Sequence, residues 1–521
     1  MPLYQETNRD KPFLFDGLTK FRRVSSFDRV SEIEPDAVAG SVNMDLDQGT
    51  IRTRRGLEAV GTGIAGAVRV QGIGYLDTAS PSLLQLLLII VDQVPYVWDG
   101  SAWSATSGYT PPTASQRVIV APLVDKLFLA TAGYNVRSWD GAAFVDLGSG
   151  GTDEPKQYGI ICAFTFRLFG AGIPDLPDTL ECSDILDATV WKPLTNSSRV
   201  GGGESDPITA LCGWQNNQLV VGKRNSVWIV ICEPTQQPAD WVMKRVVKDA
   251  GCVEHKTMCQ VGEDIFWLAR DGVRSMQYTL QGETQGVSEP ISRAIQDVID
   301  QINWPVIDTA SACYWRNRYI LSVPLGDSTE ANAILVYNTI TQGWTGTWTG
   351  WNAAAFIDTY FDGAPRLMVG RGDGTVGQWM EYVTESLEGP DQYKDFGVEF
   401  ASAGETRAMT CSELLSPKQG FSAQAEFWKS QADAALYVKL DGGGSQLFWS
   451  GATKPPGGSM VGDPIPWILG SRKYWRIGTD LQHFGSWREI QFRLECEGGK
   501  VQLRSLYLAA RVEKFEAEIN V

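Results

Sequence analysis

A short motif that recurs along the first 380 residues constrains the fold of this chain more than any other feature. VWDGSAW at residues 97–103 is followed by SWDGAAF at residues 138–144. In each copy an aromatic residue ends one strand, Asp-Gly makes a turn, and an aromatic residue opens the next strand, as in a β-hairpin. The spacing of about 40–45 residues is that of a four-stranded propeller blade, so the sequence predicts about six to eight blades. Weaker copies occur at residues 226–229, 271–274, 333–338 and 373–379.

The length and composition indicate an all-β protein of more than one domain. Of the 521 residues, 43% are hydrophobic and 20% are charged, which allows a large core, and Gly and Pro are spread along the chain. We expect an N-terminal arm and first strand over 1–60, a β-propeller over 61–388, and an additional β-sandwich or platform-like domain over 389–521. The strands expected in the third region are Ala425–Lys429, Ala435–Leu440, Gln446–Ser450, Tyr474–Thr479, Glu489–Glu495 and Val501–Leu508.

Two further local patterns carry structural predictions. Residues 42–55 alternate between apolar and polar side chains on both sides of a turn at 47–49, which is typical of a hairpin. Residues 288–302 place five apolar side chains on one helical face after Pro290, and they predict one amphipathic helix.

Charge and cysteine usage narrow the class of protein. The net charge is −16, so binding to nucleic acid through a basic surface is not expected. The nine cysteines are scattered without CxxC spacing, which predicts reduced, buried thiols in a protein assembled in a cytoplasm. No signal peptide is predicted, and the strongest apolar run, residues 83–91, is too short for a transmembrane helix.

Three patterns resemble functional sites and favour structural interpretations. Gly61, Gly63 and Gly66 form GxGxxG, but the strand-like segment that follows them does not suit a dinucleotide site. Asn43-x-Asp45-x-Asp47 begins like a calcium loop, but Gln48 and Arg54 occupy the positions that need Gly and Glu. The segment 372–375 with Trp379 resembles the Asp box of glycan-cleaving propellers, and a blade turn explains it equally well.

Residues for acid–base or nucleophilic chemistry are scarce. The two histidines, His255 and His483, lie beside no nucleophile motif, and there is no phosphate-binding loop. The tryptophans at 344, 348, 351, 467, 475 and 487 suit packing between blades or subunits better than a glycan platform. The sequence therefore predicts no catalytic, cofactor-binding or metal-binding residue, no cofactor, and a protein that is not an enzyme.

Several segments together resemble the tail nozzle proteins of short-tailed phages, also called tail tubular protein B or hub (DNA-stabilisation) proteins. The resemblance is carried by short motifs in the same order along the chain. They are PDAV…VNMDLD-Q-GTIRTRRGL at 35–57, IFWL and DGVR at 265–274, VSEPIS at 287–292, YILSVP at 319–324 and VYNTITQGWT at 336–345.

This resemblance implies a structural protein of the virion. It implies a hexameric ring below the portal and adaptor proteins, with a channel through which DNA is retained and ejected without specific binding, and docking surfaces for tail fibres or spikes. The acidic charge agrees with a wall that repels phosphate. Two other interpretations stay open at this point: a glycan-binding or glycan-degrading tail-associated propeller, and a cytoplasmic propeller scaffold.

Overall fold

The computed structural model divides into two compact units, each described by itself. Unit 1 comprises Met1–Gly56, Thr341–Trp348 and Val383–Val521, and unit 2 comprises Leu57–Ile340 and Thr349–Tyr382. The residues described are 13–47, 49–61, 64, 68–78, 84–111, 113–148, 151–203, 206–233, 236–285, 289–361, 363–383, 389–411, 416–453 and 474–512.

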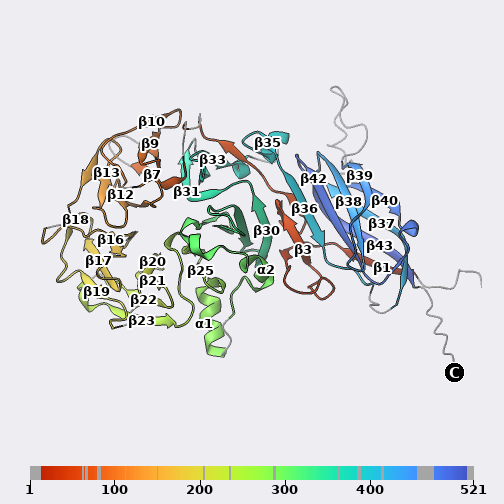
Figure 1. Ribbon diagram of the computed structural model, residues 1–521, viewed down its shortest axis with the longest axis horizontal. Coiled ribbons are helices and arrows are strands. Elements are labelled where there is room, and N and C mark those ends of the chain that lie inside the picture. Colours follow the sequence, from red (N-terminus) through yellow and green to blue (C-terminus); the bar gives the residue numbers. More distant parts are fainter. Residues whose placement is uncertain are drawn as a thin grey trace, which may run out of the picture. The chain divides into compact units, whose positions relative to one another are not determined.

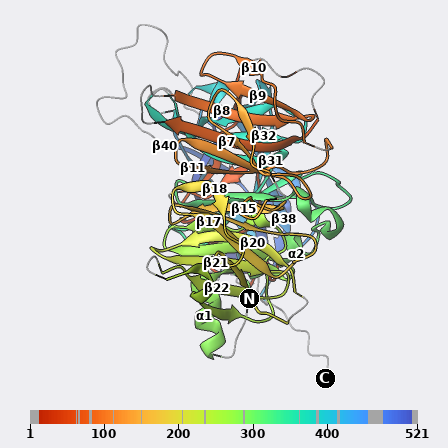
Figure 2. The ribbon, with the colours of Figure 1, turned by 90° about the vertical axis from the view of Figure 1, so that its left-hand side faces the viewer.

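Unit 2 is a β-propeller, which confirms the predicted fold class. Among the described residues, six of its blades are separate sheets of three to five strands, and the β27–β28–β29 meander fills a seventh position in the ring. Figure 1 shows the blades following one another around the ring in chain order, and Figure 2 shows the strands of the first blade lying one above another, from β10 down to β7.

The strands of the first four blades each form an antiparallel meander. They are β7 (Val70–Thr78), β8 (Leu84–Val91), β9 (Val94–Trp98), β10 (Trp103–Ala105), β11 (Ile119–Leu123), β12 (Lys126–Ala130), β13 (Arg137–Trp139), β14 (Phe144–Asp146), β15 (Ile160–Phe164), β16 (Arg167–Ala171), β17 (Thr179–Asp184), β18 (Asp187–Trp191), β19 (Ser197–Arg199), β20 (Ile208–Trp214), β21 (Gln218–Lys223), β22 (Val227–Ile231) and β23 (Val242–Val247).

The remaining blades complete the ring. Their strands are β24 (Cys259–Val261), β25 (Asp264–Ala269), β26 (Gly272–Ser275), β27 (Ser311–Trp315), β28 (Arg318–Val323), β29 (Ala333–Asn338), β31 (Ala353–Phe361), β32 (Ala364–Arg371), β33 (Val376–Trp379) and β6 (Leu57–Ala59). The first strand of each blade contacts that of the next, from β7 around to β31 and back to β7. The last sheet, β31-β32-β33-β6, takes its outer strand from the start of the unit, so pairing of β6 with β33 closes the ring.

The repeated motif forms the outer hairpins of the first two blades, as the sequence predicts. Trp98 pairs with Trp103 across the β9–β10 turn, and Trp139 pairs with Phe144 across the β13–β14 turn. At the first turn, the Asp99 carboxylate accepts hydrogen bonds from the backbone N–H groups of residues 101 and 102. Asp140 does the same for residues 142 and 143 in the second blade. These aspartates close turns, which explains their fixed spacing from the aromatic residues.

The helical elements differ from the predicted amphipathic helix. Residues 288–302 contain only a 3-10 turn at Arg293–Ile295 and the short α2 (Gln296–Ile299), and Val287 and Ser288 lie outside the described residues. The helix begins late because the Ile291 N–H donates to the Val273 carbonyl and the Ser292 hydroxyl accepts from the Val273 N–H, which ties this stretch to β26. A helix that the sequence analysis did not predict, α1 (Met276–Gln285), continues directly from β26. The other 3-10 turns are Pro238–Asp240, His255–Thr257, Trp304–Thr309, Met380–Tyr382, Pro390–Tyr393 and Gln482–Phe484.

Unit 1 is the additional sandwich-like part and contains two curled sheets. One sheet has the order β4-β5-β43-β37-β40 with β1 and β41 added, and the other contains β3-β36-β42-β38-β39 with β2 beside β3. The strands are β1 (Phe13–Leu18), β2 (Arg23–Val24), β3 (Ala37–Val42), β4 (Met44–Asp45), β5 (Ile51–Thr53), β30 (Gly343–Thr349, of which 343–348 belong here), β34 (Lys394–Asp395), β35 (Val398–Glu399), β36 (Ala401–Thr406), β37 (Lys418–Trp428), β38 (Asp433–Leu440), β39 (Gln446–Ala452), β40 (Tyr474–Asp480), β41 (Ser486–Trp487), β42 (Ile490–Glu497) and β43 (Gln502–Val512).

The two sheets face each other across an apolar core. Phe427 of β37 and Trp449 of β39 meet with ring centroids 6.1 Å apart, and Ile51 of β5 lies against the backbone of Gly404 in β36. The six strands expected between residues 425 and 508 correspond to β37, β38, β39, β40, β42 and β43. These strands could be predicted from the sequence because apolar and polar side chains alternate along them and glycine-rich turns separate them.

A buried arginine connects the N-terminal segment to the rest of unit 1. Arg54 is fully buried, and its guanidinium makes two bonds to the Asp395 carboxylate, at 3.0 and 2.5 Å. Its Nε donates to Asn43 Oδ1 at 3.0 Å, and the group stacks 3.9 Å from the Phe400 ring centre. Gly56 follows closely, where a Cβ atom would lie 1.8 Å from the carbonyl oxygen of residue 394. We call Asn43, Arg54, Asp395 and Phe400 the Arg54 hub.

Candidate functional site

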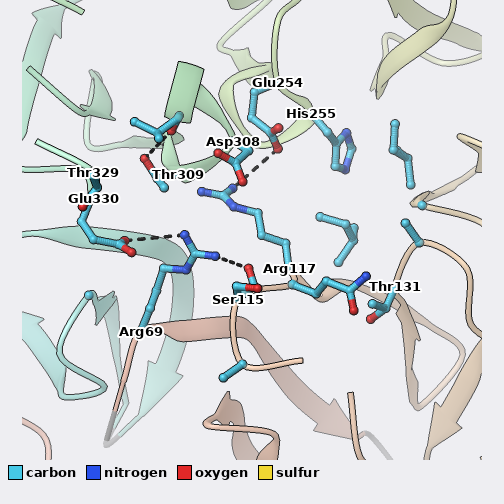
Figure 3. Close-up of a pocket in the computed structure, with 18 of the residues that line it drawn as sticks. Arg69, Ser115, Arg117, Thr131, Glu254, His255, Asp308, Thr309, Thr329 and Glu330 are labelled. Carbon is cyan, nitrogen blue, oxygen red and sulfur yellow. Dashed lines mark hydrogen bonds and ion pairs between the residues drawn. The ribbon is translucent and has the colours of Figure 1, made fainter. Parts of the chain in front are cut away.

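A cavity lies in unit 2, where the connections between blades meet. Each blade begins with its inner strand, so the residues just before these strands collect at one end of the ring. The cavity has a volume of about 890 Å³ and mixes polar and apolar walls. The side chains that carry charge or chemistry there are Arg69, Arg117, Glu254, His255, Asp308 and Glu330 (Figure 3).

Arg117 lies in the connection that leads into β11, separated from the strand by Val118, and extends towards Glu254 (Figure 3). Its Nη1 is 3.6 Å from Glu254 Oε1, which is an ion pair without a hydrogen bond, and the side chain is 11% exposed. Neither Nη1 nor Nη2 forms a hydrogen bond with any residue that the structure describes. Burial lowers the pKa of Arg117, while the negative charges of Glu254 and Asp308 act in the opposite direction. Burial likewise raises the pKa of Glu254.

Arg69 occupies the corresponding position before β7. Its Nη1 lies 3.6 Å from Glu330 Oε2, and its Nη2 donates to the carbonyl oxygen of Ser115. Figure 3 shows the two arginine side chains in the same cavity, and the positive charge of Arg69 contributes to lowering the pKa of Arg117. Two positively charged arginine side chains therefore line the cavity. One of them, Arg117, has only a long ion pair, with Glu254.

His255 is held in its neutral form beside this cavity. Its Nδ1 accepts a hydrogen bond of 3.3 Å from the backbone N–H of Leu211. Burial, together with the positive charges of Lys256 and Arg117, lowers the pKa of His255 to about 3. Burial also lowers the pKa of Lys256 to about 7, with Arg117 again contributing. A neutral imidazole that accepts from the backbone holds the loop before β24 in place.

No protein-family model and no curated protein matches the sequence. Solved structures do match. One is described as YCF48 bound to D1 peptide, with 10% identity and a TM-score of 0.36, over 63% of this chain and 95% of that chain. A likeness at this level carries no inference about activity or ligand.

The residues of the GxGxxG pattern and of the calcium-loop-like pattern make structural contacts wherever they are described. Gly61 lies against the rings of Trp98 and Trp103, and Gly63 and Gly66 lie outside the described residues. Asp45 pairs with Arg52 at 3.3 Å, and Asp47 lies 4.0 Å from the same guanidinium. These contacts account for the carboxylates as parts of the β4–β5 hairpin. In the part of the chain that the structure describes, no group of His, Cys, Asp and Glu side chains could hold a metal ion.

The Asp-box-like segment is a blade turn. The Asp373 carboxylate accepts from the backbone N–H of Thr375 at 3.0 Å and pairs with Arg371 at 2.6 Å, which closes the connection from β32 to β33. The tryptophans considered as a glycan platform are buried wherever their side chains are described. These are Trp344, Trp348, Trp351 and Trp487; the side chains of Trp467 and Trp475 lie outside the description.

A second depression lies in unit 1 over β36, β38, β39 and β42. Its volume is about 760 Å³, and small side chains form much of its floor. Two of its charged groups, Arg493 and Glu495, lie 2.6 Å apart, and Arg493 is also 4.0 Å from Glu405, which pairs with Lys439. None of the helices in the described ranges combines the length and apolar character needed to span a bilayer.

All nine cysteines are free thiols, and a prediction about their reactivity follows. Burial raises the pKa of Cys162 and Cys411 to about 11, and of Cys182, Cys232, Cys252 and Cys496 to about 12. At pH 8 these thiols stay protonated, so alkylation of the native protein by iodoacetamide should be about a hundredfold slower than that of a free cysteine. Mass spectrometry should count nine alkylated thiols in denaturant. Labelling of a native thiol at the rate of free cysteine would contradict this.

The sequence analysis did not single out Arg69 or Arg117. A signal was present: VRV at 68–70 places Arg69 directly before the first strand of a blade, and RVI at 117–119 places Arg117 before another with only Val118 between. The lining acids come from other connections, 130 or more residues further along the chain, so only the closed ring brings them together.

Proposed function

We propose that this chain is a structural protein of a phage tail nozzle. In this proposal it assembles, as a hexamer, into a ring below the portal and adaptor proteins. The ring forms a channel through which DNA is retained and ejected, and its outer surface docks fibres or spikes. The chain is a virion component assembled in the host cytoplasm, and it acts by assembly rather than by catalysis.

The main support is that motifs which carry the resemblance meet in space. Phe266 of IFWL, Tyr319 of YILSVP and Tyr337 of VYNTITQGWT lie in three different segments. The Phe266 ring centroid is 5.4 Å from that of Tyr319 and 5.4 Å from that of Tyr337, with edge-to-face geometry in both pairs. Tyr319 is fully buried, and its hydroxyl donates to the Thr257 carbonyl at 2.9 Å. A shared packing cluster explains why these motifs occur together in one chain.

A second pair of motifs, DGVR and the end of VSEPIS, also makes contact. Ser292 Oγ accepts from the Val273 N–H at 3.0 Å, and Arg274 pairs with Asp271. Gly272 has a φ of +139°, and a Cβ atom there would lie 2.3 Å from Ser292 Oγ, so glycine is required at this position. The two motifs therefore form one structural unit at the end of the β24–β26 blade.

The N-terminal motif supports the proposal in the same way. Asn43 and Arg54, within the segment 35–57, belong to the buried Arg54 hub of unit 1. These two polar residues of the N-terminal motif thus make buried structural contacts. With a net charge of −16 per chain, a ring of such subunits would repel the phosphates of passing DNA.

The proposal is tested by the mass of the purified full-length chain in native mass spectrometry, alone and with the adaptor protein of the same phage. We expect six copies in a ring, and electron microscopy should show an open centre. Exposed apolar side chains at the turns of the β15–β18 blade, Phe166 and Leu186 at 68% and 58% exposure, are candidates for contact between copies. A chain that stays monomeric even with the adaptor would refute the proposal.

A further inference from the structure

Arg117 presents an unusual combination of burial and missing hydrogen bonds. A guanidinium carries five N–H donors in a fixed fork, and a buried donor without an acceptor destabilises the folded state, more strongly when the group is charged. Here Nη1 and Nη2 are both buried, and no described residue accepts a hydrogen bond from either. Glu254 lies at 3.6 Å, too far to complete a bidentate pair.

We propose that the cavity of the propeller binds a small organic molecule through a carboxylate or phosphate group held by Arg117 and Arg69. This inference is independent of the nozzle proposal. An oxyanion with two oxygens matches the guanidinium fork of Arg117 and would supply the missing acceptors. Its negative charge would also offset the electrostatic repulsion between the two arginines, through which Arg69 lowers the pKa of Arg117.

The positions of the two arginines suit this role. Arg69 is fixed by Glu330 and by the Ser115 carbonyl, so its charge faces the cavity from one side (Figure 3). Arg117 extends from the neighbouring connection towards Glu254. Both side chains are about nine-tenths buried, at 9% and 11% exposure, so they are already ordered before a ligand arrives. Such preorganisation reduces the entropy that binding costs.

The other walls define the rest of the ligand. The cavity volume of about 890 Å³ lies in the range of small-molecule sites and far exceeds a single phosphate ion. Glu254, Asp308 and Glu330 surround the arginines, so a polyanion such as a nucleic acid would be repelled. Gln116 also lines the cavity, and its Oε1 has no hydrogen-bond donor among the described residues. The ligand class is therefore a compact organic molecule with one carboxylate or phosphate group and a hydroxyl or amino group.

Calorimetric titration of the full chain with inorganic phosphate and with acetate, at low ionic strength, tests the proposal. We expect saturable binding of at least one anion with one site per chain. Arg117→Gln should weaken it at least about tenfold, because the bidentate contact is lost. Arg117→Lys keeps the charge without the fork and should also weaken it. Lys126→Gln, at the exposed first residue of β12 and outside the cavity lining, removes the same charge and should change nothing.

A variant that gains affinity separates binding from folding. Glu254→Gln removes the negative charge nearest to Arg117 while its amide oxygen can still cap the turn at 255–257, so anion affinity should rise about threefold or more. Stronger binding of phosphate would assign the ligand to phosphate esters, and stronger binding of acetate to carboxylic acids. The proposal is wrong if neither anion binds saturably, if Arg117→Gln binds like the unchanged chain, or if inorganic triphosphate binds far more tightly than phosphate.

Discussion

Replacing Arg54 with methionine is expected to lower the free energy of unfolding of unit 1 by about 3–5 kcal/mol, the usual cost of leaving one partner of a buried ion pair alone. Methionine fills much of the space, so the loss is mainly electrostatic. Asp395 would keep its burial, at 12% exposure, without its two charged hydrogen bonds, and Asn43 Oδ1 would lose its donor. Hydrogen exchange of peptides from β4, β5 and β34, measured in the full chain, reports this locally.

The structure supplies a matched control for this substitution. Arg29 forms a surface pair with Glu32 in the same unit, and the two side chains are 82% and 65% exposed. Arg29→Met should change stability by less than about 1 kcal/mol. The double variant Arg54→Met with Asp395→Leu should regain part of the loss, since it leaves no buried charge behind. Equal exchange in Arg54→Met and Arg29→Met would show that the Arg54 hub does not hold the unit together.

Replacing His255 with asparagine is expected to make the propeller less sensitive to acid. The folded state keeps this imidazole neutral down to a pKa of about 3, whereas the unfolded chain takes up a proton below about 6.5. The unfolded state therefore binds more protons between these values, and folding stability falls as the pH falls through this window. At pH 4.5 the loss from this one group should be about 1–3 kcal/mol, and asparagine removes it while its Oδ1 can accept from Leu211.

Urea unfolding at pH 7.5 and pH 4.5 measures this effect. The stability of His255→Asn relative to the unchanged chain should improve between the two pH values. His483→Asn is the control, because His483 is exposed in the 3-10 turn Gln482–Phe484 and its surroundings change little on unfolding. An equal pH dependence in both variants would contradict the assignment of acid sensitivity to His255.

The sequence predicted the parts of the fold that depend on local chemistry. The hairpins with Asp99 and Asp140 were predictable because the turn, its aspartate and both aromatic residues lie within seven residues. Of the apolar face expected over 288–302, Ile295, Ile299 and Ile302 are buried, whereas Ile291 and Val298 are partly buried. The single helix was wrong because its first residues bond to β26, a tertiary contact that no helical periodicity contains.

The cavity could not be predicted in the same way. Arg69, Arg117, Glu254 and Asp308 come from four different connections between blades, and no motif spans them. Their meeting depends on the number of blades and on the direction in which each inner strand runs. For the same reason, the pairing of Arg54 with Asp395, 341 residues away, has no local signal. Both sites result from ring and sheet closure rather than from any one segment.

Because β6 pairs with β33, the propeller ring can close only after the ribosome has synthesised β33. About 320 residues separate the two strands, so at ordinary elongation rates a ribosome needs roughly 15–65 s between making one and making the other. During that time the blades already synthesised lack the β6–β33 pairing that closes the ring. A product truncated before Val376 would remain an open arc with two bare strand edges, which is the form of such a protein most prone to aggregate.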